Sequence, residues 1–194
     1  MSDWLDASHR SCLAIPMVWR QVTDSLGEYL RFYIAWKMVE GCMSTVVGNT
    51  LPLAKLKQYA GTPELARQSA VALVLSLHDS DDEVRAWAAE VLENMGAPTM
   101  DCTAQLAELT RHVIAPVAAW ACKLIGRLGE EGTRFQDILA AAVEKHVDVL
   151  VKQEAVAALA KLGNLSPSTR DILRRAAIHE NPRLKRMALA ALAD

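Results

Sequence analysis

The sequence predicts an all-α protein made of stacked helix pairs, preceded by a separate helical lobe. Two observations favour this fold class. Aromatic residues make up only 5% of the chain while alanine is abundant, a balance that suits closely packed helices better than sheets rich in Val, Thr and Tyr. An amphipathic segment also recurs at spacings of 33 and 34 residues in the C-terminal two-thirds of the chain, which indicates a repeat architecture.

The N-terminal lobe, residues 1–61, lacks the repeated segment and holds most of the aromatic residues. Pro16 and Pro52 interrupt it. Ser25 and Glu28 have the spacing of a capping box, and the helix that follows them is apolar on nearly every face. Such a helix has to be covered on several sides. We expect the lobe to cap the open first repeat; alternatively, part of it covers a partner or a second subunit.

The repeated segment predicts the second helix of each pair. Its copies start at Val84, Val117, Val151 and Leu184, spaced 33, 34 and 33 residues apart. In each copy the apolar residues follow the i, i+4, i+7, i+8 spacing of an amphipathic helix with one buried face. Glycines follow the first three copies, as expected where a helix ends in a left-handed residue: Gly96, Gly129 and Gly163. Residues 62–194 are therefore predicted to form about four helix pairs.

Start signals predict a first helix ahead of each second helix. A capping side chain precedes either a proline at the first helical position or a capping-box glutamine. The signals are Thr62-Pro63, Thr133 with Gln136, Ser166-Pro167 and, for the last second helix, Asn181-Pro182.

Periods of this length also occur in ankyrin and tetratricopeptide arrays, but the chain contains neither Thr-Pro-Leu-His nor Trp-x-x-Leu-Gly-x-x-Tyr. The residues instead resemble the HEAT repeat in the short form found in bacterial proteins. The first copy carries the match, in Asp79-Ser80-Asp81-Asp82-Glu83-Val84-Arg85, then Ala88-Ala89, Leu92 and Gly96. Later copies depart from it, with Ala118 replacing the turn arginine. The resemblance covers about residues 62–194 and implies an α-α superhelix, a HEAT-like solenoid, whose concave second helices usually bind proteins.

The candidate partner-binding residues lie on these second helices. Trp87 and Trp120 occupy the same register, with Glu154 and Met187 at the matching positions of the later copies. The indoles either fill gaps between alanine-rich helices or form an aromatic anchor for a partner. The complete candidate set is Trp87, Trp120, Arg85, Lys152, Glu154, Lys185 and Met187.

Four histidines, His78, His112, His146 and His179, are spaced 34, 34 and 33 residues apart, each near the end of a first helix. A histidine there can bond the last carbonyls and complement the negative end of the helix dipole. The alternative is a pH-sensitive or metal-binding edge. No metal is expected, because packed helices lie roughly 8 to 10 Å apart, too far for neighbouring imidazoles to share an ion without other ligands.

Charge and motifs disfavour several other functions. The net charge of -2 gives no general attraction to nucleic acid or anionic membrane. The most apolar stretch, residues 26–47, is interrupted by charges, and the N-terminus lacks the features of a secretory signal. A cytoplasmic protein without membrane contact is therefore expected.

No nucleophile elbow, phosphate loop or His-Glu-x-x-His motif is found, so neither catalysis nor a cofactor is expected. The cysteines, interpreted as core thiols, are Cys12, Cys42, Cys102 and Cys122.

The resulting hypothesis is a noncatalytic adaptor or regulator that binds another protein on the concave face. Two alternatives depart from this role. One is a HEAT-like DNA glycosylase, a class that uses aromatic residues with a carboxylate; Trp87, Trp120 and Glu154 loosely resemble this arrangement. The other is a HEAT-type bilin lyase. The last helix has no capping repeat behind it, which leaves a homodimer through this end as a further alternative. The nearby basic cluster is interpreted as either a solvated face or an acidic-partner site: Arg170, Arg174, Arg175, Arg183, Lys185 and Arg186.

Overall fold

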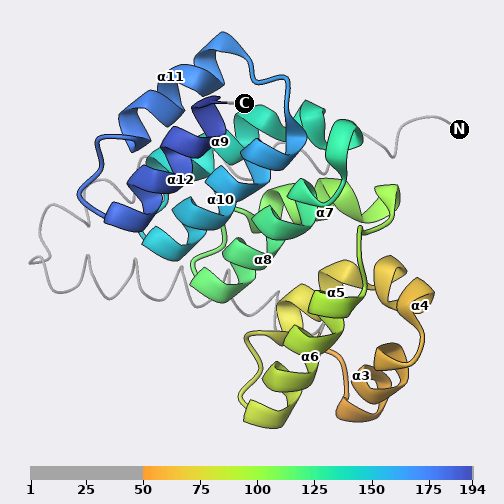
Figure 1. Ribbon diagram of the computed structural model, residues 1–194. Coiled ribbons are helices and arrows are strands. Elements are labelled where there is room, and N and C mark those ends of the chain that lie inside the picture. The colour runs from red at the N-terminus through yellow and green to blue at the C-terminus, as the bar shows by residue number, and fades with distance from the viewer. Residues whose placement is uncertain (1–49, 194) are drawn as a thin grey trace, which may run out of the picture. The chain divides into compact units, whose positions relative to one another are not determined.

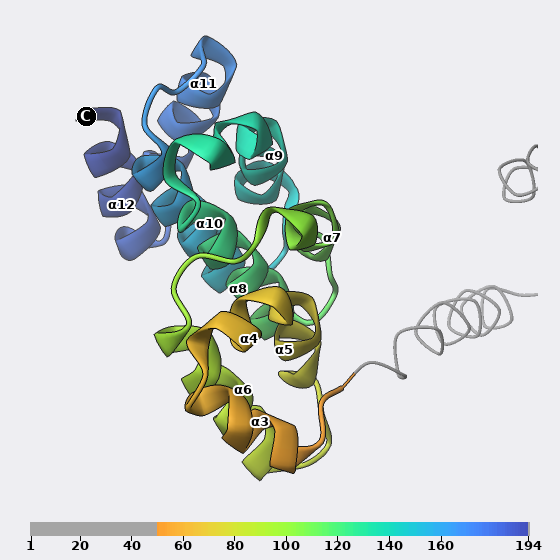
Figure 2. The same ribbon diagram turned by 90° about the vertical axis from the view of Figure 1, so that its right-hand side faces the viewer.

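A computed structural model describes residues 50–193 (Figures 1 and 2). These residues form helices joined by turns, and no strand occurs among them. They belong to a compact unit that starts at Asn49. The predictions made for Pro16 and for the helix after Ser25 fall outside the described residues.

The described residues form four successive helix pairs preceded by one additional helix. The first elements are α3 (Leu53–Ala60), α4 (Pro63–Gln68), α5 (Ala70–Ser76) and α6 (Asp82–Asn94). Next come η1 (Met100–Cys102), α7 (Thr103–Leu109), α8 (Ala115–Gly126), η2 (Gly129–Phe135) and α9 (Gln136–Lys145). The chain continues through α10 (Val149–Leu162), α11 (Pro167–Ala176) and α12 (Pro182–Ala193).

The helices stack in two layers. Each first helix packs on its second helix, which pairs α5 with α6, α7 with α8, α9 with α10 and α11 with α12. Along the array, α10 packs between α8 and α12 in the layer of second helices, and α9 packs on α11 in the other layer (Figure 2). This arrangement confirms the predicted all-α solenoid.

The aliphatic residue that starts each repeated segment lies in the core. Val117, Val151 and Leu184 are fully buried, and Val84 is 8% exposed. The buried face of each second helix therefore lies where the periodicity places it, because apolar residues at helical spacing lose the most contact with water when they face a neighbouring helix.

Helix α3 lies on the lobe side of the predicted domain boundary at residue 61. It nevertheless packs against α6, and its Leu56 is fully buried. The first helix of the first pair also differs from the expectation of one continuous helix after Thr62-Pro63, since it divides into α4 and α5 at Ser69. Thr62 lies at the N-cap of α4, but its side chain makes no capping hydrogen bond.

The predicted stop signals are confirmed in the backbone. Gly96, Gly129 and Gly163 have φ angles of +80°, +59° and +62°, which a side chain would strain. Two start signals are confirmed as well. The Ser166 hydroxyl accepts a hydrogen bond from the Thr169 amide at 3.2 Å, and α12 begins at Pro182 directly after its cap.

The capping box predicted at Thr133 is wrong. The Thr133 hydroxyl donates to the Glu130 carbonyl within η2, and α9 starts at Gln136 without a side-chain cap. The buried Gln136 amide instead bridges to the next turn: it donates to the Asn164 carbonyl at 3.0 Å and accepts from the Ser166 amide at 3.0 Å. A buried amide requires such partners.

Helices α8 and α10 approach each other closely at Gly126. A Cβ atom added there would lie 2.7 Å from the Cα atom of Ala158. The glycine therefore allows backbone-to-backbone contact between the second and third pairs. In the first pair, Glu93 occupies the same register, nine residues after the leading valine, and its exposed carboxylate pairs with Lys123 on α8.

Candidate partner-binding surface

Trp87 lies on α6 and is half-buried. A lysine from another helix covers its ring, with the Lys57 Nζ atom on α3 placed 5.5 Å from the ring centroid. The same ammonium pairs with Glu83 Oε1 at 3.1 Å. A cation at this distance is attracted to the negative face of the indole, so the ring helps to fix α3 on α6 while part of it remains accessible.

Trp120, at the same register of α8, is also half-buried. The Lys123 Nζ atom lies 4.2 Å from its ring centroid and the Arg127 Cζ atom lies 5.7 Å away. Both cations follow the tryptophan on its own helix face, at i+3 and i+7. The structure thus combines each predicted indole with cations that the candidate set omitted.

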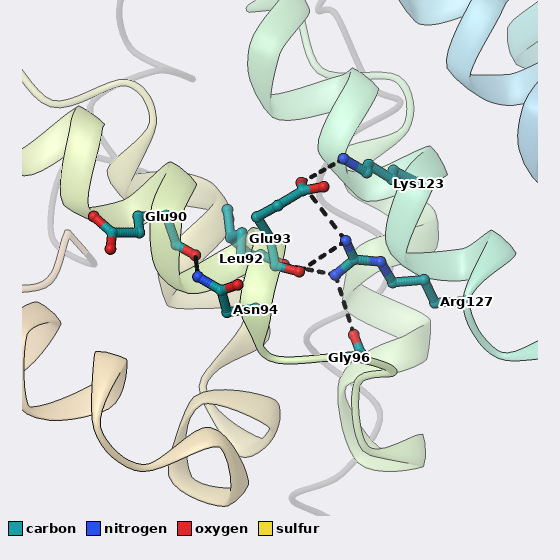
Figure 3. A network of polar contacts seen from close by, with 7 residues as sticks. All are labelled: Glu90, Leu92, Glu93, Asn94, Gly96, Lys123 and Arg127. Atoms are coloured by element: carbon teal, nitrogen blue, oxygen red, sulfur yellow. Dashed lines mark hydrogen bonds and ion pairs between the residues drawn. The ribbon is translucent and has the colours of Figure 1, made fainter.

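The two cations of α8 also join the first and second pairs (Figure 3). Arg127 Nη1 donates to the Leu92 carbonyl at 2.6 Å and to the Gly96 carbonyl at 3.3 Å, and Nη2 donates to the Glu93 carbonyl at 3.2 Å. These carbonyls lie at the C-terminal end of α6, where a helix carries unpaired acceptors and partial negative charge. Arg127 therefore completes α6 from the neighbouring repeat.

The Glu93 carboxylate lies between these cations. Lys123 Nζ contacts its Oε2 atom at 2.5 Å, and Arg127 Nη2 lies 3.7 Å from the same oxygen. The hydrogen bond from Lys123 lowers the pKa of Glu93; partial burial opposes this, and the charges of Lys123, Arg127 and Lys161 support it. Glu93 therefore stays ionised, and the edge of the Trp120 surface carries a stable ion cluster.

Arg85 and Lys152 have a different role from the tryptophans. Arg85 Nη1 donates to the Asp79 carbonyl at 2.6 Å, and its other terminal nitrogen pairs with Asp82. Lys152 Nζ lies 3.5 Å from the Glu144 carbonyl. Both side chains reach back across the turn within their own repeat, so they lie at the turn edge of the array.

The remaining candidates are placed on the last two second helices. Glu154 on α10 and Met187 on α12 are half-buried, and Lys185 on α12 is exposed.

The cysteine thiols are the next group. Burial raises the pKa of the Cys122 thiol to about 12, and the negative charge of the nearby Glu154 adds to this effect. Cys102 and Cys122 are buried thiols, as predicted, whereas Cys12 and Cys42 lie outside the described residues.

The histidine series has a different register and role from those predicted. Relative to the leading aliphatic residue of each second helix, the equivalent positions are Asp79, His112, His146 and His179, each five residues ahead of it. In all four turns the side chain accepts the backbone N–H of the residue two positions on. The distances are 3.0 Å for Asp79 Oδ1, 3.2 Å for His112 Nδ1, and 3.0 Å for Nδ1 of both His146 and His179.

These bonds require an unprotonated Nδ1 atom, which corrects the expectation that the imidazoles bond the last carbonyls of their own helices. Burial lowers the pKa of His112, and the nearby His78 lowers it further. His146 Nε2 lies 3.3 Å from the His112 carbonyl; with Nδ1 accepting, Nε2 carries the proton and donates. His78 itself is exposed.

The basic cluster of the fourth repeat is partly paired. Arg174 contacts Asp171 at 2.5 Å and Arg175 contacts Glu144 at 2.6 Å. Three further basic side chains are exposed on α12: Arg183, Lys185 and Arg186.

In the described part of the chain, no cluster of three or more His, Cys, Asp or Glu residues could hold a metal ion. No helix between residues 50 and 193 is long and apolar enough to cross a bilayer.

The stacked helix pairs, their glycine stops and the side-chain bonds that span each turn define the class of protein: an α-solenoid. Residues 70–159 match the family model of HEAT repeats, which supports a HEAT-repeat family for this part of the chain. Repeats of this family commonly mediate contacts between proteins and are generally noncatalytic. No curated protein matches the chain.

Proposed function

We propose that this protein is a noncatalytic adaptor or regulator that binds another protein across its second helices. The observation that carries the proposal is the pair of half-buried indoles, Trp87 and Trp120, at one register of successive second helices, each with a lysine over its ring. Tryptophan and arginine, here Trp87, Trp120 and the adjacent Arg127, are enriched among the residues that anchor protein interfaces.

The arrangement supports a binding role because the cations are already positioned. Lys123 and Arg127 are held by acceptors at the end of α6, so a partner does not have to order these side chains on binding. Preorganised groups of this kind favour affinity by reducing the entropy lost on association.

The test is affinity capture from native-host lysate with the full chain, read by mass spectrometry. We expect a protein that is recovered with the wild type to be lost with the Trp87→Ala, Trp120→Ala double variant. Phe135→Ala is the matched control, because Phe135 lies outside the second helices and also has a cation near its ring, with Arg134 Cζ at 4.8 Å. Circular dichroism checks that all variants retain their helical content.

Two results would overturn the proposal. One is recovery of the same proteins with the wild type and the double variant, provided that both are folded. The other is recovery of nucleic acid or a small molecule without any protein, which would favour the glycosylase or lyase alternatives.

A further inference from the structure

A pocket of about 310 Å³ opens between the third and fourth repeats. Its apolar lining comes from Val143 at the end of α9, Ile172 on α11 and Leu184 in the first turn of α12. The volume is at the lower end of the range of small-ligand sites. Because its residues come from the ends of α9 and α11 and the starts of α10 and α12, the pocket lies at the turn edge of the array.

The rim of the pocket is basic. Lys152, Arg175 and His179 line it together with Glu144. Arg175 neutralises Glu144 at 2.6 Å, which leaves the Lys152 ammonium in excess. His179 accepts the Asn181 amide with Nδ1, which leaves Nε2 as the ring nitrogen that can donate to a ligand.

The surroundings strengthen this charge. Residues 165–193 contain six basic and two acidic residues, a formal charge of +4 with His neutral, whereas residues 50–164 contain eleven basic and fifteen acidic residues, a formal charge of -4. The positive charge of the described chain is therefore concentrated on the repeat that forms one wall of the pocket. Such a concentration attracts acidic ligands and orients their approach.

Exposed aliphatic side chains also occur in the sequence next to residues that line the pocket. Val147, in the turn between α9 and α10, is 95% exposed, and Ile178, in the turn between α11 and α12, is 82% exposed. Leu150, at the start of α10, is 44% exposed. Large aliphatic groups exposed in the turns that adjoin the lining residues, together with a basic rim, favour a docking surface over a solvated charged face.

We propose that this turn-edge pocket binds an acidic peptide segment of a partner protein, with an aliphatic side chain in the pocket and a neighbouring carboxylate on Lys152 and His179. The occupant is acidic because the rim and the fourth repeat are basic, and it is apolar in part because the pocket lining and both turns are apolar. This site is separate from the tryptophan surface of the second helices and does not depend on that surface binding anything.

The experiment selects short random peptides displayed on phage against the full chain and measures the selected peptides by fluorescence anisotropy. We expect the selected sequences to combine Asp or Glu with Leu, Ile, Met or Phe, and to bind more weakly as salt rises. Lys152→Glu should weaken binding about tenfold or more, because it places a like charge opposite the ligand carboxylate.

Two further variants separate binding from folding. Ile178→Ser changes a side chain that is 82% exposed, so it should leave the fold intact and still weaken the peptide. Lys55→Glu is the matched charge reversal on α3, outside the pocket, and should leave affinity unchanged. The proposal is overturned if the selected peptides lack acidic residues or bind Lys152→Glu as well as the wild type. It is also overturned if duplex DNA or phosphatidylserine vesicles, but no peptide, bind in a manner that depends on Lys152.

Discussion

At the scale of single residues, one turn position shows how different side chains solve the same problem. Asp79 and three histidines each accept an N–H group two residues further along the chain. A short polar side chain does this routinely in an Asx turn. An imidazole can replace it only while Nδ1 is free of a proton, so three of the four turns depend on neutral histidine.

This dependence predicts a loss of stability in mild acid. The pKa of His112 in the fold is lowered from its usual value of 6.5, so the unfolded chain binds a proton first as the pH falls. The free energy of unfolding should therefore decrease below about pH 6.5 and level off once the folded state is also protonated. His112→Asn keeps an acceptor without a titrating group and should reduce this slope, measured by urea unfolding across pH.

The matched control is His78→Asn. His78 is exposed, so this variant should retain most of the pH dependence. An unchanged slope in His112→Asn would contradict the role of the imidazole at this turn.

At the scale of helices, the position nine residues after the leading valine makes different contacts in the first two pairs. Gly126 allows contact between α8 and α10, while Glu93 places a carboxylate on the corresponding side of α6. We expect Gly126→Ala to destabilise the protein by about 1–3 kcal/mol, because overpacking against Ala158 outweighs the better helix propensity of alanine. Chemical denaturation measures this change.

Gly61→Ala provides the comparison for this prediction. A Cβ atom at Gly61 would meet only the Gln58 carbonyl oxygen, at 3.6 Å. This variant should be neutral or slightly stabilising, by up to about 1 kcal/mol. Equal effects of the two substitutions would mean that the close approach at Gly126 has no energetic role.

The sequence predicted the second helices, their glycine stops and the buried aliphatic positions, because helical periodicity directly reports a buried face. It did not predict the division of the first helix at Ser69 or the role of Gln136, since both depend on contacts with other segments. The histidines were aligned by residue type, which placed His78 in a series where Asp79 makes the equivalent bond. Lys57 carries no local signal at all, because it reaches Trp87 from a helix outside the repeats.

At the scale of the whole described unit, the two successive junctions differ in chemistry. Helix α8 packs closely on α10, whereas α6 packs mainly on α3 and α5 and meets α8 through Arg127 and Lys123. Stability in a repeat array is roughly the sum of the repeats and their nearest-neighbour interfaces. The first pair should therefore open more readily than the pairs that follow.

Arg127→Ala tests this expectation. The variant removes charged hydrogen bonds to three carbonyls from a side chain that is 16% exposed, and should cost about 2 kcal/mol. Hydrogen exchange should then become faster in α6 while the amides of α10 and α12 keep their protection. Arg111→Ala, which loses only an exposed pair with Glu108 at 4.0 Å, should change neither region. A uniform increase in exchange across all helices would contradict the separate junction.

The carboxylate of Glu93 also has a mechanical consequence. Bending of a stacked array concentrates where adjacent layers are least stiff, and a junction of ion pairs yields more easily than two backbones in direct contact. Screening by salt weakens exposed ion pairs but leaves close apolar packing largely unchanged. We therefore expect rising ionic strength to soften the junction between α6 and α8 more than the close contact between α8 and α10.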